Sequence, residues 1–326
     1  MNLVKLFSSL ETPEAGNFNL FNALTLANYP FAKIAKNCEE HPVILISSIR
    51  GGGNLVQKNV RLKYLELSHN LECKVLENNH EHYANFTLII FKSNLYYLQN
   101  YFLGIAETLI KSLSLTPTDQ EVLKTFRDFV EIFHSLSNPP TKTTQGLWAE
   151  LLLIETSYNP SKLLNYWHNN PQDKFDFNAD VEKLEVKSSS NGERVHTFSS
   201  EQLTPNNNDQ VLIASLFTKQ ITHGVSILDL TIVIQNKIKE VELSEKLFSI
   251  VNKTLGHSIE QAIKIKYDYE LAKNSLRFYR HQDISKIEKI NIPNKVSDVR
   301  YKSDLSLVKA VFPKDSSISG ILFTSI

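Results

Sequence analysis

The spacing of apolar residues changes along this chain, and that change limits its folds more than any other feature. From Phe18 to about Phe102 the apolar residues stand in short runs such as HPVILISS and ANFTLIIFKS, which have the length and β-branched content of strands. After Phe102, in TDQEVLKTFRDFVEIFHSL for example, they recur three and four residues apart, which indicates helices, and Thr116 or Thr118 is a candidate cap. We therefore expect a β-rich module that ends in helices.

A polar segment with two adjacent prolines interrupts this pattern. SNPPTKTTQ (residues 137–145) holds no apolar run, and its prolines cannot continue a helix, so it indicates a connection between folded parts. We place a domain boundary here, with a β-rich N-terminal module in residues 1–140 and a second domain in residues 141–326. Inside the first module we expect turns at RGGGN (residues 50–54) and ENNHEHY (residues 77–83).

The second domain begins with a helix pattern and continues with a hairpin pattern. GLWAELLLIETSYNP predicts a well-buried helix, and KFDF, a turn at residues 178–180 and VEKLEVKSSS predict a β-hairpin. This order of helix, hairpin, strand and helix predicts an α/β sandwich of the α+β kind, a mixed sheet flanked by helices. The other expected elements are a short helix in SKLLNYWHN, strands in RVHTFSS, QVLIASLF, YELAKNSLRFYRHQ and VRYKSDLSLVKAVF, a helix start at SSEQL, and one or two helices in residues 226–256.

Two acidic residues and a lysine in the hairpin can meet on one face. Strand alternation in VEKLEVKS puts Glu185 and Lys187 on one side, and Leu184 and Val186 on the side that packs into the core. Asp176 stands between two phenylalanines that favour the core, so its side chain should point the other way. A hairpin can bring Asp176 next to Glu185.

This arrangement suits a divalent cation. Two neighbouring carboxylates repel each other, and a hard dication that prefers oxygen ligands relieves the repulsion. We expect Asp176 and Glu185 to bind Mg²⁺, for which Mn²⁺ can substitute, with the main-chain carbonyl of Val186 as a third ligand. Such a site suits phosphodiester hydrolysis, in which Lys187 orients or deprotonates the attacking water or stabilises the pentacovalent charge. The alternative is a solvated Glu–Lys pair on an exposed strand; Glu182 is a competing acid, but it lies on the core face.

The segment from residue 146 to residue 203 resembles a known family. GLWAELLLIE, a helix that contains Trp167, then DF, EVKSSS and SSEQL are similar to the PD-(D/E)XK proteins of the DUF4420 group, which are related to restriction endonucleases. The similarity continues through LRFYR and VRYKSDLS and, more weakly, into the N-terminal half. It implies a restriction-endonuclease-like core in which Asp176, Glu185 and Lys187 are the motif residues. KFD stands here in place of the proline and aspartate of the family name, a departure that is frequent in the superfamily.

The resemblance also implies two further site residues. Glu150 matches a helix glutamate that often completes such sites as a metal ligand or by holding a water, and Gln202 matches a glutamine that approaches the metal-bound water or the scissile phosphate in some branches. Each has a structural alternative. Glu150 could be an exposed helix position, and Gln202 a first-turn residue that answers a cap at Ser199 or Ser200. Glu155 lies on another face of the helix and is expected at the surface.

Contacts with nucleic acid are weakly indicated. Thirty-five basic residues balance thirty-five acidic ones, so any DNA contact must use a local basic strip. Arg277 and Arg280 in LRFYRHQ are candidates for phosphate contacts, and His196 in RVHTF is a third, although a lone histidine on a strand is more often structural. The two cysteines lie outside any zinc-ligand spacing.

Together these features favour a Mg²⁺-dependent endonuclease that cuts double-stranded DNA in restriction or phage defence. Because cutting both strands needs two active sites, we expect a homodimer or larger assembly, with a methyltransferase or a helicase/ATPase as possible companions. The N-terminal module would recognise DNA or a partner protein. No apolar stretch suits a membrane span or a secretory signal, so a cytoplasmic location is expected. The alternative is a non-catalytic DNA-binding or assembly subunit of a multi-protein defence complex. A third hypothesis, a nuclease for RNA or modified DNA, keeps the chemistry and changes only the substrate.

Overall fold

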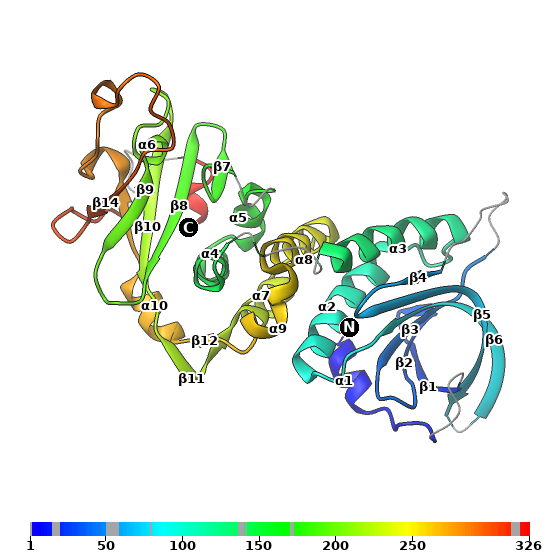
Figure 1. The fold of residues 1–326 in the computed structure, drawn as a ribbon. Helices are drawn as coiled ribbons and strands as arrows, with labels where there is room; N and C mark the ends of the chain where they lie inside the picture. Colours follow the sequence, from blue (N-terminus) through cyan, green and yellow to red (C-terminus); the bar gives the residue numbers. More distant parts are fainter. Residues whose placement is uncertain are drawn as a thin grey trace. The chain divides into compact units, whose positions relative to one another are not determined.

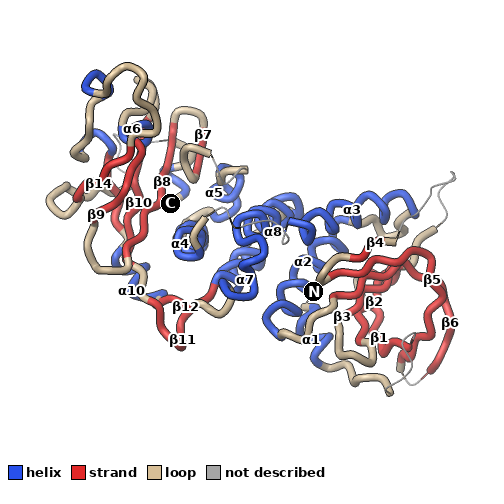
Figure 2. The backbone as a smooth tube through the Cα atoms, in the orientation of Figure 1, coloured by secondary structure: helices blue, strands red, loops and turns tan. Residues whose placement is uncertain are grey.

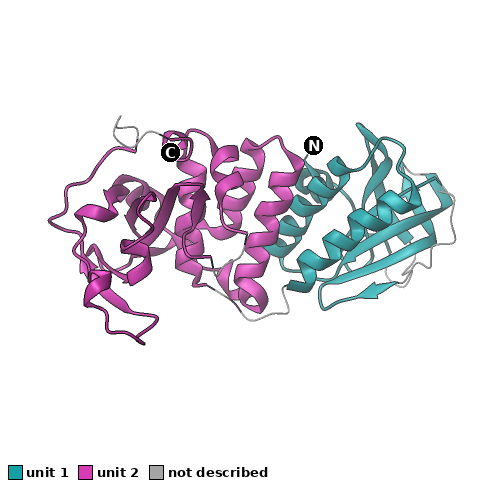
Figure 3. Ribbon diagram, turned by 90° about the horizontal axis from the view of Figure 1, so that it is seen from above, with its two compact units in different colours: residues 1–138 teal, residues 139–326 magenta. Residues whose placement is uncertain are grey.

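A computed structural model shows the chain folded into two compact units, residues 1–138 and residues 139–326 (Figure 3). The structure describes residues 2–14, 20–49, 59–78, 80–135, 140, 142–169, 173–313 and 320–326. The expected turn at RGGGN lies outside these residues. Within them, no helix is both long enough and apolar enough to cross a bilayer.

The first unit is built around a closed sheet. Its strand order is β1-β2-β3-β6-β5-β4, and a parallel pairing of β1 with β5 joins the ends, so five of the strands form a barrel (Figures 1 and 2). Alternate side chains from these five strands, among them Phe21, Val43, Val75 and Leu88, pack together inside. The strands are β1 (Leu20–Leu26), β2 (Tyr29–Lys36), β3 (Pro42–Ile46), β4 (Val60–Arg61), β5 (Leu65–Glu77) and β6 (His80–Phe91).

Helices follow the barrel strands, as the change of apolar spacing predicts. The helix α2 (Tyr96–Ser112) is buried along most of its length, and Thr118 caps α3 (Asp119–His134) through its side-chain oxygen. Phe91 of β6 stacks on Phe102 of α2, with ring centroids 4.9 Å apart, so the helices share an aromatic core with the barrel wall. A short helix, α1 (Leu3–Ser8), precedes the barrel.

The second unit contains a four-stranded mixed sheet in the order β13-β10-β8-β7. The central strand β10 runs parallel to β8, whereas β7 and β13 are antiparallel to their neighbours (Figure 1). The chain therefore combines helices with separate sheets, as expected of the α+β class. The sheet strands are β7 (Phe177–Ala179), β8 (Glu182–Ser189), β10 (Gln210–Phe217) and β13 (Arg277–Arg280).

The helix α4 (Thr144–Thr156) packs between β8 and α7 (Ile227–Lys237). Its side chains from Leu147 to Glu155 are all buried, because apolar residues occur on every side of it. The remaining elements of this unit are α5 (Pro160–Tyr166), β9 (Val195–Ser199), α6 (Ser200–Leu203), β11 (Gln220–Ser226), α8 (Val241–Leu255), α9 (Ile259–Ala262), β12 (Lys266–Tyr267), α10 (Tyr269–Ser275) and β14 (Arg300–Asp304).

Four sequence expectations were wrong in detail. The turn expected at residues 178–180 lies at residues 180–181, because β7 runs from Phe177 to Ala179, and of KFDF only Phe177 is in the strand. YELAKNSLRFYRHQ was expected to be one strand, but its first part is the helix α10, whose N-cap Asp268 accepts a hydrogen bond from Leu271 N, and only its second part is β13. The turn expected over ENNHEHY extends too far, since residues 80–83 already belong to β6, which begins at His80. Glu155 is 9% exposed and lies inside the unit rather than at its surface, because Lys237 and Tyr269 both bind its carboxylate.

Candidate metal-binding site

The hairpin brings Asp176 near Glu185. Phe177 of β7 pairs with Leu184 of β8; Asp176 directly precedes Phe177 and Glu185 directly follows Leu184, so the two acids lie beside the end of this pairing. Asp176 Oδ2 accepts a hydrogen bond from Val186 N at 2.8 Å, which fixes the carboxylate against β8. Phe175 and Phe177 are both buried, as their apolar character predicts.

Alternation along β8 separates the two glutamates. Glu185 shares a face with Lys187, and the residue as a whole is 6% exposed. Glu182 points to the other face, where its Oε2 accepts a hydrogen bond from Leu322 N at 2.7 Å. Glu182 therefore holds the C-terminal segment in place and is no rival to Glu185.

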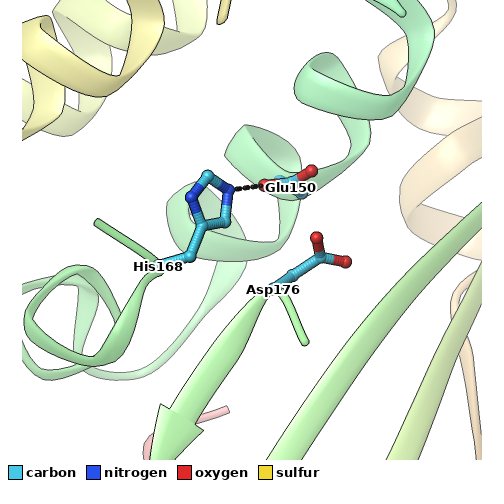
Figure 4. Close-up of side chains that lie close together, drawn as sticks. All are labelled: Glu150, His168 and Asp176. Atoms are coloured by element: carbon cyan, nitrogen blue, oxygen red, sulfur yellow. Dashed lines mark hydrogen bonds and ion pairs between the residues drawn. The ribbon is translucent and has the colours of Figure 1, made fainter. Parts of the chain in front are cut away.

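A glutamate from α4 reaches the same region. Glu150 is 3% exposed, and its Oε2 accepts hydrogen bonds from Trp167 Nε1 at 2.7 Å and from His168 Nε2 at 3.0 Å. His168 follows α5, and its main-chain N–H bonds the carbonyl of Asp176 at 2.9 Å, which holds the two residues side by side. Figure 4 shows Glu150 and Asp176 directed toward one another, with the His168 ring beside them.

A lysine fills the space between these side chains. Lys142 Nζ lies 2.8 Å from Glu150 Oε1, 2.6 Å from Asp176 Oδ1 and 3.3 Å from His168 Nε2. Because His168 Nε2 cannot donate to Glu150 and accept from Lys142 at once, we take the shorter contact with Glu150 as the hydrogen bond. The ammonium thus neutralises two buried carboxylates.

A second lysine sits beside Glu185. Lys187 Nζ donates to Glu185 Oε1 at 2.7 Å and to Gln202 Oε1 at 3.3 Å, and it lies 5.2 Å from the centre of the Phe198 ring. Gln202 also accepts from Ser199 N at 3.2 Å in a capping box that begins α6. Gln202 therefore has the helix-capping role that was its structural alternative, and it also contacts Lys187.

Burial and charge move the three carboxyl pKa values apart. Burial raises the pKa of Glu150, but the His168 hydrogen bond and the Lys142 charge outweigh it and lower the pKa to about 2. Burial and the charge of Glu150 raise the pKa of Asp176. Burial, with the charge of Asp176, raises the pKa of Glu185 to about 7, although Lys187 opposes the shift. Such divergent values among neighbouring acids are typical of functional sites.

One family model matches almost the whole chain. Residues 4–306 match the model described as "Putative PD-(D/E)XK family member, (DUF4420)". The chain belongs to this family. No curated protein and no solved structure gives a match.

The PD-(D/E)XK chain has a donor set that fits a divalent cation. Three atoms that could bind a metal, one each from Glu150, His168 and Asp176, lie within 4.8 Å of one another, and all three residues are buried. Carboxylate oxygens suit Mg²⁺ and Mn²⁺, and an imidazole suits Mn²⁺ and later transition metals. The ammonium of Lys142 already occupies the space within reach of all three atoms, so the cluster is built to hold positive charge.

The three residues expected to contact DNA lie on other strands. His196 on β9 is 4% exposed, and its Nε2 lies 2.7 Å from Ser215 Oγ; burial lowers the pKa of His196 to about 4, so the ring is neutral. Arg277 on β13 is exposed and bonds the carbonyls of Asn274 and Leu276. Arg280, on the same strand, is half-buried.

Sequence reasoning missed Lys142 and His168. Lys142 lies in the polar segment SNPPTKTTQ, where nothing in the pattern distinguishes a site residue from a linker residue. His168 follows Trp167 at the end of a short helix. An ionisable side chain next to a large aromatic residue was the one feature of the sequence that could have indicated a buried site residue here.

Proposed function

We propose that this protein is a metal-dependent endonuclease that hydrolyses phosphodiester bonds in double-stranded DNA. The observation that carries the proposal is the position of Asp176, which directly precedes β7 and accepts a hydrogen bond from Val186 N of β8, with Glu185 and Lys187 on β8 and Glu150 reaching in from α4. Membership of the PD-(D/E)XK family supports nuclease chemistry at these positions.

In this proposal the acidic residues hold one or more Mg²⁺ or Mn²⁺ ions. Asp176, Glu185, Glu150 and the main-chain carbonyl of Val186 supply oxygen ligands, and His168 supplies a nitrogen. The cation, when bound, supplies a Lewis acid for the scissile phosphate and lowers the pKa of its water.

Lys187 is proposed to act at the attacking water or at the charged transition state. Its ammonium is held by Glu185 and Gln202, two groups that fix the position of Nζ. A positioned cation next to the developing charge stabilises the transition state of phosphoryl transfer. Gln202 acts through Lys187 in this scheme and is therefore a positioning residue.

The second unit is proposed to be the cutting domain, with a restriction-endonuclease-like sheet. Support comes from its mixed four-stranded sheet, from the hydrogen bond that holds Asp176 against β8 next to Glu185, and from the helix glutamate of α4. Arg277 and Arg280 of β13 are proposed phosphate contacts. His196 is left out of this set, because its buried ring is bonded to Ser215.

The wider biological setting is also a proposal. Cutting both strands calls for two active sites, so a homodimer or larger assembly is expected, and light scattering measures its mass. A role in restriction or phage defence fits an enzyme of this kind, with a methyltransferase or helicase/ATPase companion. The barrel unit would then recognise DNA or the companion.

A cleavage assay tests the proposal. Purified protein is incubated with supercoiled plasmid and Mg²⁺ or Mn²⁺, beside the variants Asp176→Ala and Lys187→Ala. Both variants should lose cleavage by about 100-fold or more, the scale typical of groups that stabilise transition-state charge. Lys237→Ala is the control, because Lys237 is an exposed lysine of α7 that binds Glu155 and none of the site residues. Equal cleavage by wild type and both site variants, or none by wild type with either metal, would overturn the proposal.

A further inference from the structure

Lys142 and a divalent cation need the same space. The three ligand-type atoms of Glu150, His168 and Asp176 lie within 4.8 Å of one another, and Lys142 Nζ is within 3.3 Å of each of the three side chains. Metal ions bind oxygen and nitrogen ligands at about 2.0 to 2.6 Å, which places them between the same atoms. An ammonium and a dication cannot both stand there, because they overlap and repel one another.

Lys142 is also the member of this group that is able to leave. Its side chain is 21% exposed, whereas those of Glu150 and Asp176 are 3% and 9% exposed. It directly precedes the N-cap Thr143 of α4 and lies in no helix or strand, whereas Glu150 lies within α4 and Asp176 is hydrogen-bonded to β8. A lysine ammonium moves on a four-carbon stem with rotatable bonds, so it can swing out without moving the backbone.

The second lysine of the site, Lys187, does not lie between the three ligand-type atoms. Lys187 binds Glu185 and Gln202, and neither of these residues belongs to the three-residue cluster. The loss of Lys187 therefore removes a charge near the site but does not empty the space between Glu150 and Asp176. The two lysines have different expected effects on metal affinity.

We propose that Lys142 is an internal competitor for the catalytic metal ion: its ammonium closes the Glu150–His168–Asp176 cluster, and a divalent cation binds only when Lys142 withdraws. This inference rests on the proposed metal-dependent function. The protein then exists in a closed form and a metal-competent form, and the apparent metal affinity equals the intrinsic affinity reduced by the competent fraction. Lys142 sets the cation concentration at which the site fills.

Direct binding of Mn²⁺ tests the competition without any cleavage. The free protein is titrated with Mn²⁺ by calorimetry, for the wild type and for Lys142→Met, whose unbranched side chain is one atom shorter and carries no charge. If the closed form holds about 90 to 99% of the molecules, the variant should bind about 10 to 100 times more tightly. The control is Lys237→Met, which removes a lysine paired with Glu155 on the same helix α4 and should leave the affinity within about 2-fold. Unchanged or weaker binding by Lys142→Met, including no binding by either protein, would overturn the inference.

Amine labelling of the unaltered protein gives a second measurement. Acetylation of Lys142 by an N-hydroxysuccinimide ester, followed by mass spectrometry of the peptide, should be slow without metal and should rise several-fold when Mn²⁺ saturates the site. Lys237 should be labelled equally in both conditions. Labelling of Lys142 that stays the same or falls on addition of Mn²⁺ would contradict the proposed withdrawal.

The outcomes separate the inference from the proposed function. Tighter Mn²⁺ binding by Lys142→Met, in a protein that cleaves no DNA, would support the competition and reject the endonuclease. DNA cleavage by the wild type, together with unchanged Mn²⁺ affinity in the variant, would support the endonuclease and reject the competition.

Discussion

At the scale of single residues, the site contains three carboxylates and two lysines, so the lysines cannot neutralise all of the acids. Glu150 and Asp176 share Lys142, whereas Glu185 has Lys187 on one side and Asp176 on the other. Burial disfavours the charged form of each acid. The carboxylate with the least nearby positive charge therefore keeps its proton to the highest pH. Glu185 is that position, which makes its protonation the main link between pH and the state of the site.

Without metal, stability should fall as the pH rises through neutrality. The pKa of Glu185 is about 7 in the folded protein and near its ordinary value of 4.5 when unfolded, so the folded state binds more protons between these values. The stabilisation is therefore full below about pH 4.5 and is lost as the pH approaches and passes 7. Urea unfolding in EDTA at pH 5.5 and pH 8 should show that Glu185→Gln removes a pH-dependent difference on the order of 1 to 3 kcal/mol. An identical pH dependence in the two proteins would refute the assignment, and exposed Glu201→Gln serves as the control.

The two tryptophans offer a matched comparison of hydrogen bonds. Both are almost fully buried; Trp167 Nε1 donates to the Glu150 carboxylate at 2.7 Å, and Trp148 Nε1 donates to the main-chain carbonyl of Val225 at 2.9 Å. A bond to a charged group contributes more than a bond to a neutral one. We expect Trp167→Phe to lower the free energy of unfolding by about 1 kcal/mol more than Trp148→Phe does, measured by urea denaturation at pH 7. A larger loss in Trp148→Phe would contradict this ranking.

Alternation identified Glu185 and Lys187 from the sequence, because residues two apart on a strand share a face whatever the rest of the fold does. The flanking phenylalanines gave the orientation of Asp176 in the same way. Lys142 could not be found by such reasoning, since it lies 34 residues before Asp176 and belongs to no strand or helix pattern of the sequence. Only the folded positions of α4 and the hairpin bring the two side chains within 2.6 Å.

At the scale of elements, the short helix α6 is connected to the site through Gln202, which caps the helix and contacts Lys187. Gln202 accepts from Ser199 N in the capping box and from Lys187 Nζ through the same oxygen. Gln202→Ala should cost about 0.5 to 2 kcal/mol of stability, whereas Gln202→Glu keeps the capping acceptor and most of the stability. Urea unfolding of both variants, with the exposed Asn207→Ala as control, measures the difference. A loss in Gln202→Ala no larger than that in the control would show that the capping bond contributes nothing measurable.

Helices and strands were predictable from the sequence where one spacing of apolar residues continued along the whole element. The helices α2 and α3 and the strands β8 and β10 follow the apolar spacing of their sequences. YELAKNSLRFYRHQ misled because a short helix and a short strand adjoin within it, and neither is long enough to establish a period. The closure of the barrel was also beyond the pattern, since the pairing of β1 with β5 joins segments some fifty residues apart in the sequence.

At the scale of the whole molecule, each unit has its own core. Aliphatic and aromatic side chains of the barrel strands form one cluster in residues 1–138, and a separate cluster around Ile213 and Phe198 lies in residues 139–326. Both tryptophans of the chain, Trp148 and Trp167, belong to the second unit. Tryptophan fluorescence therefore reports the unfolding of the second unit alone, while far-ultraviolet circular dichroism reports both units.

Metal binding should stabilise the second unit and leave the first unchanged. Ligand at about 100 times its Kd stabilises a folded unit by about 2.7 kcal/mol, which for a unit of this size corresponds to a rise in Tm of about 5 to 10 °C. We expect Mn²⁺ to raise the midpoint of the fluorescence transition by this amount and to leave a second transition, seen only by circular dichroism, at its original temperature. In Asp176→Ala, which lacks a carboxylate of the cluster, Mn²⁺ should shift neither transition. Coincident transitions that move together with Mn²⁺ would mean instead that the two units unfold as one, so that cation binding in the second unit also stabilises the barrel.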